Sequence, residues 1–143
     1  ILFSLMSFLI SACHVLHQDV ELAAKKNINP SQAHEPLPVV IRIYELKSID
    51  QFIKLSFYQM WQSDKHLLGE TIISRHEYTI TPNTKQEVLI DWNSATKYIA
   101  IFGIFRHPDQ THWKAWKEVN PAMSLLETYH VTIEKNKLLF KKA

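Results

Sequence analysis

The sequence contains one cysteine and two glycines in 143 residues, and each shortage excludes a class of site. A single cysteine can form neither an internal disulfide nor a metal centre built on several thiolates, so the fold must depend on its apolar core. Two glycines cannot build a glycine-rich loop that cradles phosphate groups. The sequence also has no Gly-x-Ser-x-Gly motif for a serine nucleophile. We therefore predict that the chain is not an enzyme.

The sequence also lacks an excess of one charge. Sixteen lysines and arginines face fourteen aspartates and glutamates, a formal net charge of +2, and 46% of residues are hydrophobic. This balance is typical of a globular domain and gives no reason to expect nucleic acid as a partner. Lys137, Lys141 and Lys142 form a basic C-terminus, which we interpret as the solvated face of a last strand.

Eight histidines suggest a metal site, and the densest group is His107, Asp109 and His112. Pro108 interrupts this group, and the sequence has no His-Glu-x-x-His motif or comparable ligand spacing. We interpret the segment as a surface loop, and we predict no metal and no noncovalent cofactor.

The N-terminal residues suggest a secretory signal. Residues 1–10 carry no charge, and the small residues Ser11 and Ala12 precede Cys13. An apolar stretch this short cannot span a bilayer as a helix, but it fits the core of a signal peptide. The pattern looks like a bacterial lipoprotein signal, with residues 1–12 as a truncated signal peptide. The alternative is that residues 1–12 form a buried element and Cys13 is a small core residue.

If the signal is genuine, Cys13 carries a covalent diacylglycerol and an N-acyl chain. Residues 13–18 then form a membrane-proximal tether, and residues 19–143 form one folded domain. His14 follows the cysteine, where aspartate would favour retention in the inner membrane, so we expect the periplasmic face of the outer membrane.

Alternation of polar and apolar residues predicts most of the domain as short strands. The pattern indicates strands over residues 19–24, 39–46, 70–74, 77–81, 86–92, 98–105 and 112–119, and a hairpin over 128–134 and 137–142. Val39, Ile41 and Ile43 should share a core face, with Arg42 on the opposite face. Residues 98–105 are apolar on both faces, which predicts a central strand covered on both sides.

One helix is predicted between these strands. Ser48 and Gln51 have the spacing of a capping box, and Asp50 is favourable at a helix N-terminus. Apolar residues then recur at helical spacing and predict one sheet-facing stripe: Ile49, Phe52, Ile53, Phe57, Met60 and Trp61. The fold class is therefore an all-β-dominated sandwich of two sheets with one inserted amphipathic helix.

The segment from residue 27 to residue 38 predicts a long, stiff loop between the first two strands, because it contains three prolines and two asparagines. Loops of about a dozen residues in compact domains are usually functional. We select it as the partner-binding surface, with these candidate residues: Asn27, Asn29, Pro30, Ser31, Gln32, His34 and Glu35.

The order of these features resembles the TssJ family of type VI secretion lipoproteins. The resemblance is carried by the lipobox cysteine, Asn29-Pro30, the segment Pro38-Val39-Val40-Ile41-Arg42-Ile43-Tyr44-Glu45-Leu46, Phe52, Leu68-Gly69, Pro82, Phe105-Arg106 and Trp113-Lys114. The chain departs from relatives at Asn83 and in its loop, where Gln32-Ala33-His34-Glu35 contains no glycine.

The resemblance implies a transthyretin-like sandwich on the inner leaflet of the outer membrane. It implies that the loop at residues 27–37 binds the periplasmic C-terminal domain of TssM, and so brings TssM and TssL into the membrane complex. Two alternatives remain open: a lipoprotein carrier or assembly factor of another envelope machine with the same fold, and a periplasmic enzyme. A carrier would need an apolar pocket between the sheets, and an enzyme would need a cleft with convergent polar side chains.

Overall fold

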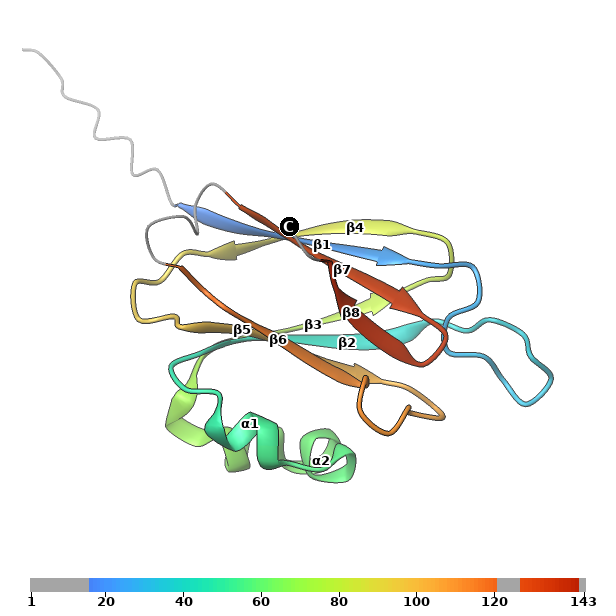
Figure 1. Cartoon of the computed structure of the whole chain (residues 1–143), viewed down its shortest axis with the longest axis horizontal. Helices are drawn as coiled ribbons and strands as arrows, with labels where there is room; N and C mark the ends of the chain where they lie inside the picture. Colours follow the sequence, from blue (N-terminus) through green and yellow to red (C-terminus); the bar gives the residue numbers. More distant parts are fainter. Residues whose placement is uncertain (1–15, 121–126, 142–143) are drawn as a thin grey trace, which may run out of the picture.

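The computed structural model describes residues 16–120 and 127–141, which form two four-stranded β-sheets packed face to face (Figure 1). The first sheet has the order β4-β1-β7-β8, and the second has the order β3-β2-β5-β6. The predicted all-β-dominated sandwich is confirmed. The predicted signal peptide and Cys13 lie outside the described residues. No helix in the described ranges is long and apolar enough to cross a membrane.

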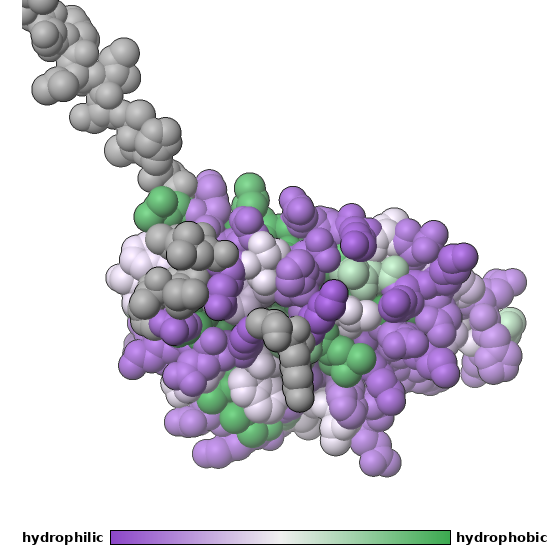
Figure 2. All heavy atoms as spheres, turned by 45° about the horizontal axis from the view of Figure 1, so that its top comes forward, coloured by the Kyte–Doolittle hydropathy of each residue, from purple (hydrophilic) through white to green (hydrophobic). Residues whose placement is uncertain are grey.

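The first sheet buries one face and exposes the other. It consists of β4 (Lys85–Asp91), β1 (His17–Ala24), β7 (Thr128–Glu134) and β8 (Lys137–Phe140), and β1 runs antiparallel to β4 and parallel to β7. Side chains that alternate along a strand point to opposite faces, so Val20 and Leu22 are fully buried while their neighbours face solvent. The exposed face of this sheet is largely hydrophilic (Figure 2).

Strand β1 begins at His17, earlier than the sequence indicated. Gln18 is buried, and its side-chain nitrogen lies 3.5 Å from the Tyr129 hydroxyl. The predicted tether over residues 13–18 is therefore wrong at its last two residues, which belong to the folded domain.

The second sheet is covered on both faces. Its strands are β3 (Ile72–Ile80), β2 (Val39–Leu46), β5 (Tyr98–Ile104) and β6 (Lys114–Glu118). The sandwich core covers one side, and the helices lie against the other (Figure 1). The predicted central position of β5 is confirmed, since it lies between β2 and β6. Ile41 and Ile43 are fully buried as expected, but Arg42 on the opposite face is also buried.

The helical insertion consists of two helices rather than one. Helix α1 spans Asp50–Lys54 and α2 spans Phe57–Leu68, followed by the 3-10 turn η1 (Gly69–Thr71). The expected capping box at Ser48 and Gln51 is wrong. It forms instead at Ser56, whose hydroxyl accepts from the Gln59 backbone N–H while the Gln59 side chain accepts from the Ser56 N–H.

The break between the helices changes which side chains face the sheet. Leu55 has an extended backbone with ψ of 138°, and its side chain is buried. Phe52 and Met60 are fully buried as predicted, but Ile53 and Trp61 are 44% and 46% exposed. The predicted single apolar stripe is therefore wrong at these two positions.

Two strands of the sequence prediction are one strand in the structure. The patterns over residues 70–74 and 77–81 belong to the continuous strand β3. The terminal hairpin is confirmed, with Glu134 paired to Lys137 and Lys135 at a positive φ of 50° in the turn. Lys142 lies outside the described residues.

Candidate interaction surface

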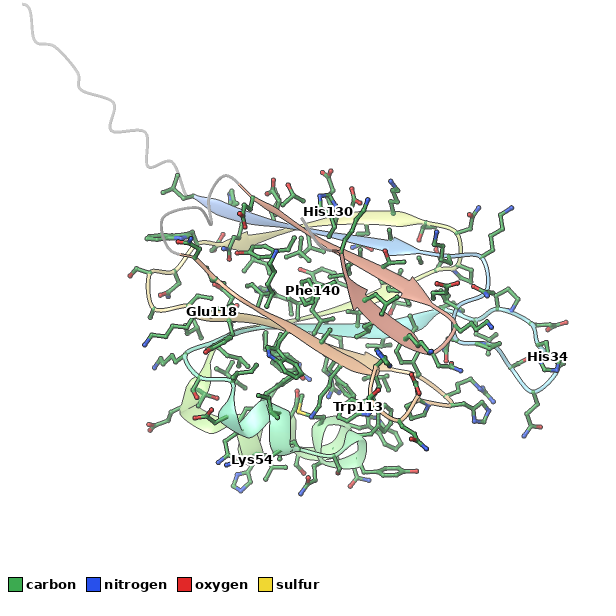
Figure 3. The ribbon with its side chains drawn as sticks, in the orientation of Figure 1. His34, Lys54, Trp113, Glu118, His130 and Phe140 are labelled. Atoms are coloured by element: carbon green, nitrogen blue, oxygen red, sulfur yellow. The ribbon has the colours of Figure 1, made fainter. Side chains whose placement is uncertain are left out.

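The segment between β1 and β2 projects beyond the sandwich at one end of the molecule (Figures 1 and 3). His34 lies near the outer extremity of this loop in Figure 3. The start of β1 at His17 lies at the opposite end, because β1 runs the length of the sheet toward the loop (Figure 1). The end that carries the loop is called the loop end below.

Asn29 forms the base of this loop. Its side chain is buried, its amide nitrogen donates to the Pro38 carbonyl at 2.7 Å, and its amide oxygen accepts from the Arg106 backbone N–H at 2.8 Å. Its own backbone N–H donates to the Lys135 carbonyl at 2.8 Å. The positive φ of 45° suits asparagine, which tolerates the left-handed region. Ile28 beside it is fully buried. In this structure Asn29 positions the loop and offers no side-chain atoms to a partner.

The outer part of the loop closes on itself in a small turn. Ser31 N–H donates to the Glu35 carbonyl at 2.8 Å, and His34 N–H donates to the Ser31 carbonyl at 2.9 Å. Glu35 N–H also donates to the Ser31 hydroxyl at 3.2 Å. The turn therefore has a defined shape before any partner binds, which reduces the entropy lost on binding.

Apart from the buried Asn29, the predicted partner-binding residues divide into two groups. Asn27, Gln32, His34 and Glu35 are exposed, and Pro30 and Ser31 are half-buried. We call residues 31–35 the loop tip. Sequence reasoning missed the partners that hold the base, because Arg106 and Lys135 are distant in sequence and act through backbone atoms.

Sequence reasoning also missed an apolar groove of about 290 Å³ between α2 and the connection from β5 to β6. Tyr58 and Trp61 on α2 are 68% and 46% exposed, and their ring centroids are 6.2 Å apart. The groove is lined by Phe57, Tyr58, Trp61, Ile104, Phe105, Arg106 and Pro108. The one signal in the sequence is the aromatic pair Tyr58 and Trp61, three positions apart; the predicted sheet-facing stripe contains Trp61 and leaves Tyr58 unassigned.

Helix α2 is attached to the second sheet through Asp64, a buried carboxylate. It accepts a hydrogen bond from the Tyr44 hydroxyl at 2.6 Å and another from the Arg75 guanidinium at 2.6 Å. Arg42 lies 3.4 Å away and donates to the carbonyls of Met60 and Trp61. Burial by itself would raise the pKa of Asp64, but these hydrogen bonds and charges hold it below its usual value.

The same contacts shift the pKa of the Tyr44 side chain. Burial, the hydrogen bond to Asp64 and the carboxylate charge raise the pKa of Tyr44 well above its ordinary value. Tyr44 thus stays a neutral donor across the physiological range, and the carboxylate stays charged. The network fixes α2, and with it one wall of the groove, on the sheet.

Helix α1 is held by Lys114 on the edge strand β6. The Lys114 ammonium donates to the carbonyls of Phe52, Ile53 and Leu55 at 2.8, 2.7 and 2.9 Å. It also lies 4.7 Å from the centroid of the Trp113 ring. The contact satisfies carbonyls that the end of a helix leaves free. Burial lowers the pKa of Lys114 to about 8.

The other polar features of the described surface are a hydrogen-bonded pair in a loop and a hollow over the first sheet. Asp109 accepts from His112 at 2.8 Å in an exposed loop, and the described residues hold no group of three metal-ligating side chains. A polar hollow of about 400 Å³ lies over the exposed face of the first sheet, with Glu21, Lys25, Lys85 and His130 among its lining residues. Its side chains belong to a solvated surface (Figure 2).

Two four-stranded sheets, a helical layer over one of them and a preshaped loop at one end define a class: a β-sandwich domain with a protruding contact surface. Within this class, the chain belongs to the family of type VI secretion lipoproteins, VasD, EvfM, TssJ, whose family model matches residues 17–137. Members of this family are structural lipoprotein components of the type VI secretion system. No curated protein matches the chain significantly.

Solved structures share the fold. Serratia marcescens Lip, a membrane-bound component of the type VI secretion system, is 16% identical with a TM-score of 0.78, covering 91% of this chain and 99% of its own. The lipoprotein TssJ1 from Pseudomonas aeruginosa is 20% identical with a TM-score of 0.75, at 91% and 99% coverage. A chain in the structure of the T6SS protein TssM C-terminal domain from EAEC is 22% identical with a TM-score of 0.73, at 89% and 98% coverage.

Proposed function

We propose that this chain is an outer-membrane-anchored adaptor of a type VI secretion system that binds the periplasmic C-terminal domain of TssM. Through TssM it would bring TssL into the membrane complex. The observation that carries the proposal is the loop at residues 27–37, whose exposed tip closes over a buried base at Ile28 and Asn29. Membership of the lipoprotein family and the TssM structure that contains a chain of this fold support it.

The loop fits the task of binding a partner because it is shaped in advance. A tip that is already closed by hydrogen bonds from Ser31 loses little conformational freedom on binding. The exposed residues Gln32, His34 and Glu35 offer hydrogen-bonding groups of both kinds. The proposed role is binding, without a catalytic step.

The geometry of β1 supports an anchor at Cys13. Only three residues separate Cys13 from His17, where β1 begins. At roughly 3.5 Å per residue, this places the start of β1 within about 14 Å of the lipid anchor. Two or three acyl chains would make release from the membrane rare. Because the loop lies at the far end of β1, the anchored domain would present it away from the membrane.

The small-ligand carrier remains the weaker candidate. Such a carrier needs an apolar cavity between the sheets, whereas the two hollows described above lie on the outer surface. Side chains that are fully buried, among them Leu22, Ile41, Ile43 and Tyr129, fill the space between the sheets.

Binding to the purified periplasmic C-terminal domain of the cognate TssM tests the adaptor. The variant replaces residues 31–35 by glycine and serine at equal length and keeps Ile28 and Asn29, so that the base stays intact. The matched control changes exposed Ser94 and Ala95 to glycine in the β4–β5 connection near the start of β1. We expect the unmodified chain and the control to bind, and the loop variant to lose at least tenfold in affinity while its melting temperature is unchanged.

Equal affinity of the loop variant and the control would contradict the assignment of the loop. The anchor is tested separately with Cys13→Ser, followed by fractionation of the cells. We expect the unmodified chain in the outer-membrane fraction and the variant in the soluble periplasm. Recovery of the variant in the membrane fraction would contradict the lipid anchor.

A further inference from the structure

The groove beside α2 exposes aromatic surface that the fold does not require. Tyr58 is the most exposed of the large hydrophobic side chains in the described residues, at 68%, and Trp61 one helical turn later is 46% exposed. Both belong to a hollow of about 290 Å³ that also contains Arg106. Tyrosine, tryptophan and arginine are the residues that most often dominate binding energy at protein interfaces.

The floor of this groove is rigid. Phe57 is the first residue of α2, and its ring packs edge-on against Phe102 at 5.3 Å and Trp113 at 5.5 Å between centroids. Phe105 is also buried. The helix above this floor is held by the buried network of Asp64. A hollow with fixed walls keeps its shape when empty, which favours docking of a side chain from outside.

The groove is continuous with the loop that the proposed function assigns to the partner. Arg106 is one of the residues that line the groove. Its backbone N–H donates to the side-chain oxygen of Asn29 at the loop base. One hydrogen bond therefore connects the two surfaces. The base of the loop and one end of the groove are therefore adjacent.

The charges at the loop end favour an acidic occupant. The exposed side chain of Arg106 takes part in none of the ion pairs found among the described residues. Exposed Lys25, Lys26 and Lys135 lie at the base of the same loop, and Glu35 is the carboxylate of its tip. Asp109 is already paired with His112 and Lys137.

We propose that the groove is a second docking site for the partner of the loop, and that it takes an apolar or aromatic side chain of that partner next to a carboxylate that pairs with Arg106. This inference rests on the proposed function, since it assigns the groove to the same TssM domain. It adds the chemistry of the contact: an acidic segment whose apolar side chain binds between α2 and the β5–β6 connection.

The test measures binding of the complete chain, purified in detergent, to the periplasmic C-terminal domain of the cognate TssM. The variants are Tyr58→Ala and Arg106→Gln. Both side chains are exposed, and the backbone N–H of Arg106 remains available to Asn29. The matched controls are Leu89→Ala and Lys85→Gln, two exposed positions on the first sheet.

We expect each groove variant to weaken binding at least tenfold and each control to change it less than twofold. Arg106→Gln should also reduce the dependence of the association rate on salt, because it removes a charge that attracts the partner. A photo-crosslinking amino acid at position 58 should form a covalent adduct with the TssM domain, and the same amino acid at position 89 should not.

The outcomes separate the two proposals. If the groove variants bind like the unmodified chain and position 58 does not crosslink, while replacement of residues 31–35 abolishes binding, the second docking site is wrong and the adaptor function stands. If the unmodified chain does not bind the TssM domain at all, both proposals are wrong. Loss of binding in the controls as well would show a nonspecific effect and would overturn the assignment to the groove.

Discussion

The outer faces of the two sheets differ in how they are covered. The face of the first sheet lies in solvent, and its ion pairs, such as His130 with Glu21 at 3.2 Å, are partly exposed. The corresponding face of the second sheet lies under α1 and α2, where Asp64 of α2 is almost completely buried and accepts hydrogen bonds from Tyr44 and Arg75 of the sheet. Charged side chains therefore face water on the first sheet, whereas on the second sheet they attach a helix.

The largest expected effect of a single change is at Asp64. Asp64→Ala leaves buried Arg42 and half-buried Arg75 with only the partly exposed carboxylate of Glu77, and we expect it to lower the free energy of unfolding by about 3 kcal/mol, the low end for breaking a buried pair. Urea unfolding at neutral pH measures this loss. A decrease below about 1 kcal/mol would show that the network does not hold α2 on the sheet.

The same carboxylate predicts the direction of the pH dependence. Because the folded pKa of Asp64 is lowered, its stabilising contribution is present above the ordinary value of 3.8 and is lost as the pH falls through the folded pKa. The unmodified chain should therefore lose stability more steeply with falling pH in this acidic range than Asp64→Ala.

The next effect is expected at Gly103 in the central strand β5. A β-carbon at this position would lie 2.5 Å from the Phe105 ring, whose side chain is buried. Gly103→Ala should therefore cost about 1–3 kcal/mol through overpacking. The double variant Gly103→Ala with Phe105→Leu should lose less than the two single changes added together, because the smaller side chain removes the clash. Additive losses would contradict the clash as the cause.

A smaller effect concerns Lys114 and depends on pH. Its folded pKa is about 8 and its ordinary value is 10.5, so between these values the unfolded chain binds more protons than the folded one. The free energy of unfolding of the unmodified chain should rise with pH through this window relative to Lys114→Met. Urea unfolding at pH 7.5 and pH 9.5 measures the difference. An identical pH slope in both proteins would contradict the shift.

The strands were predictable because half-buried strands follow a strict alternation. Val20 and Leu22 in β1, and Ile41 and Ile43 in β2, are buried as their period indicates. The covered face of the second sheet was harder to predict. Arg42 alternates like a solvent-facing residue, and its burial depends on two carboxylates distant in sequence, Glu77 on β3 at 2.8 Å and Asp64 on α2 at 3.4 Å.

The helical insertion shows a second limit of local patterns. The spacing of a capping box occurs twice, at Ser48 with Gln51 and at Ser56 with Gln59, and only the second forms the motif. Leu55, which separates the two helices, is buried and has an extended backbone, and the second helix begins directly after Ser56. The two predicted strands that form β3 show the same limit. Arg75 lies in the middle of β3 and is polar, and its partner Asp64 is on a separate helix.

The sequence predicted the position of the loop, but not the contacts at its base or the neighbouring groove. Three prolines and two asparagines indicated a stiff connection over residues 27–38, and its tip is closed by hydrogen bonds as that stiffness suggests. The buried role of Asn29 depends on Arg106 and Lys135, which approach only in the folded chain. The groove combines α2 with the β5–β6 connection, and no sequence window contains both.

The smallest effect is expected on the solvent-exposed face of the first sheet. Glu21→Gln removes the carboxylate that faces His130 on the exposed sheet, a pair 3.2 Å apart with both side chains partly in solvent. Exposed pairs of this kind contribute roughly 0–1 kcal/mol, because water already solvates both groups. We expect the free energy of unfolding, measured in urea at neutral pH, to change by less than about 0.5 kcal/mol. A loss comparable to that of Asp64→Ala would mean that burial is not what separates the two sheets. In that case the stability of the helix-covered face could not be attributed to the absence of solvent around Asp64.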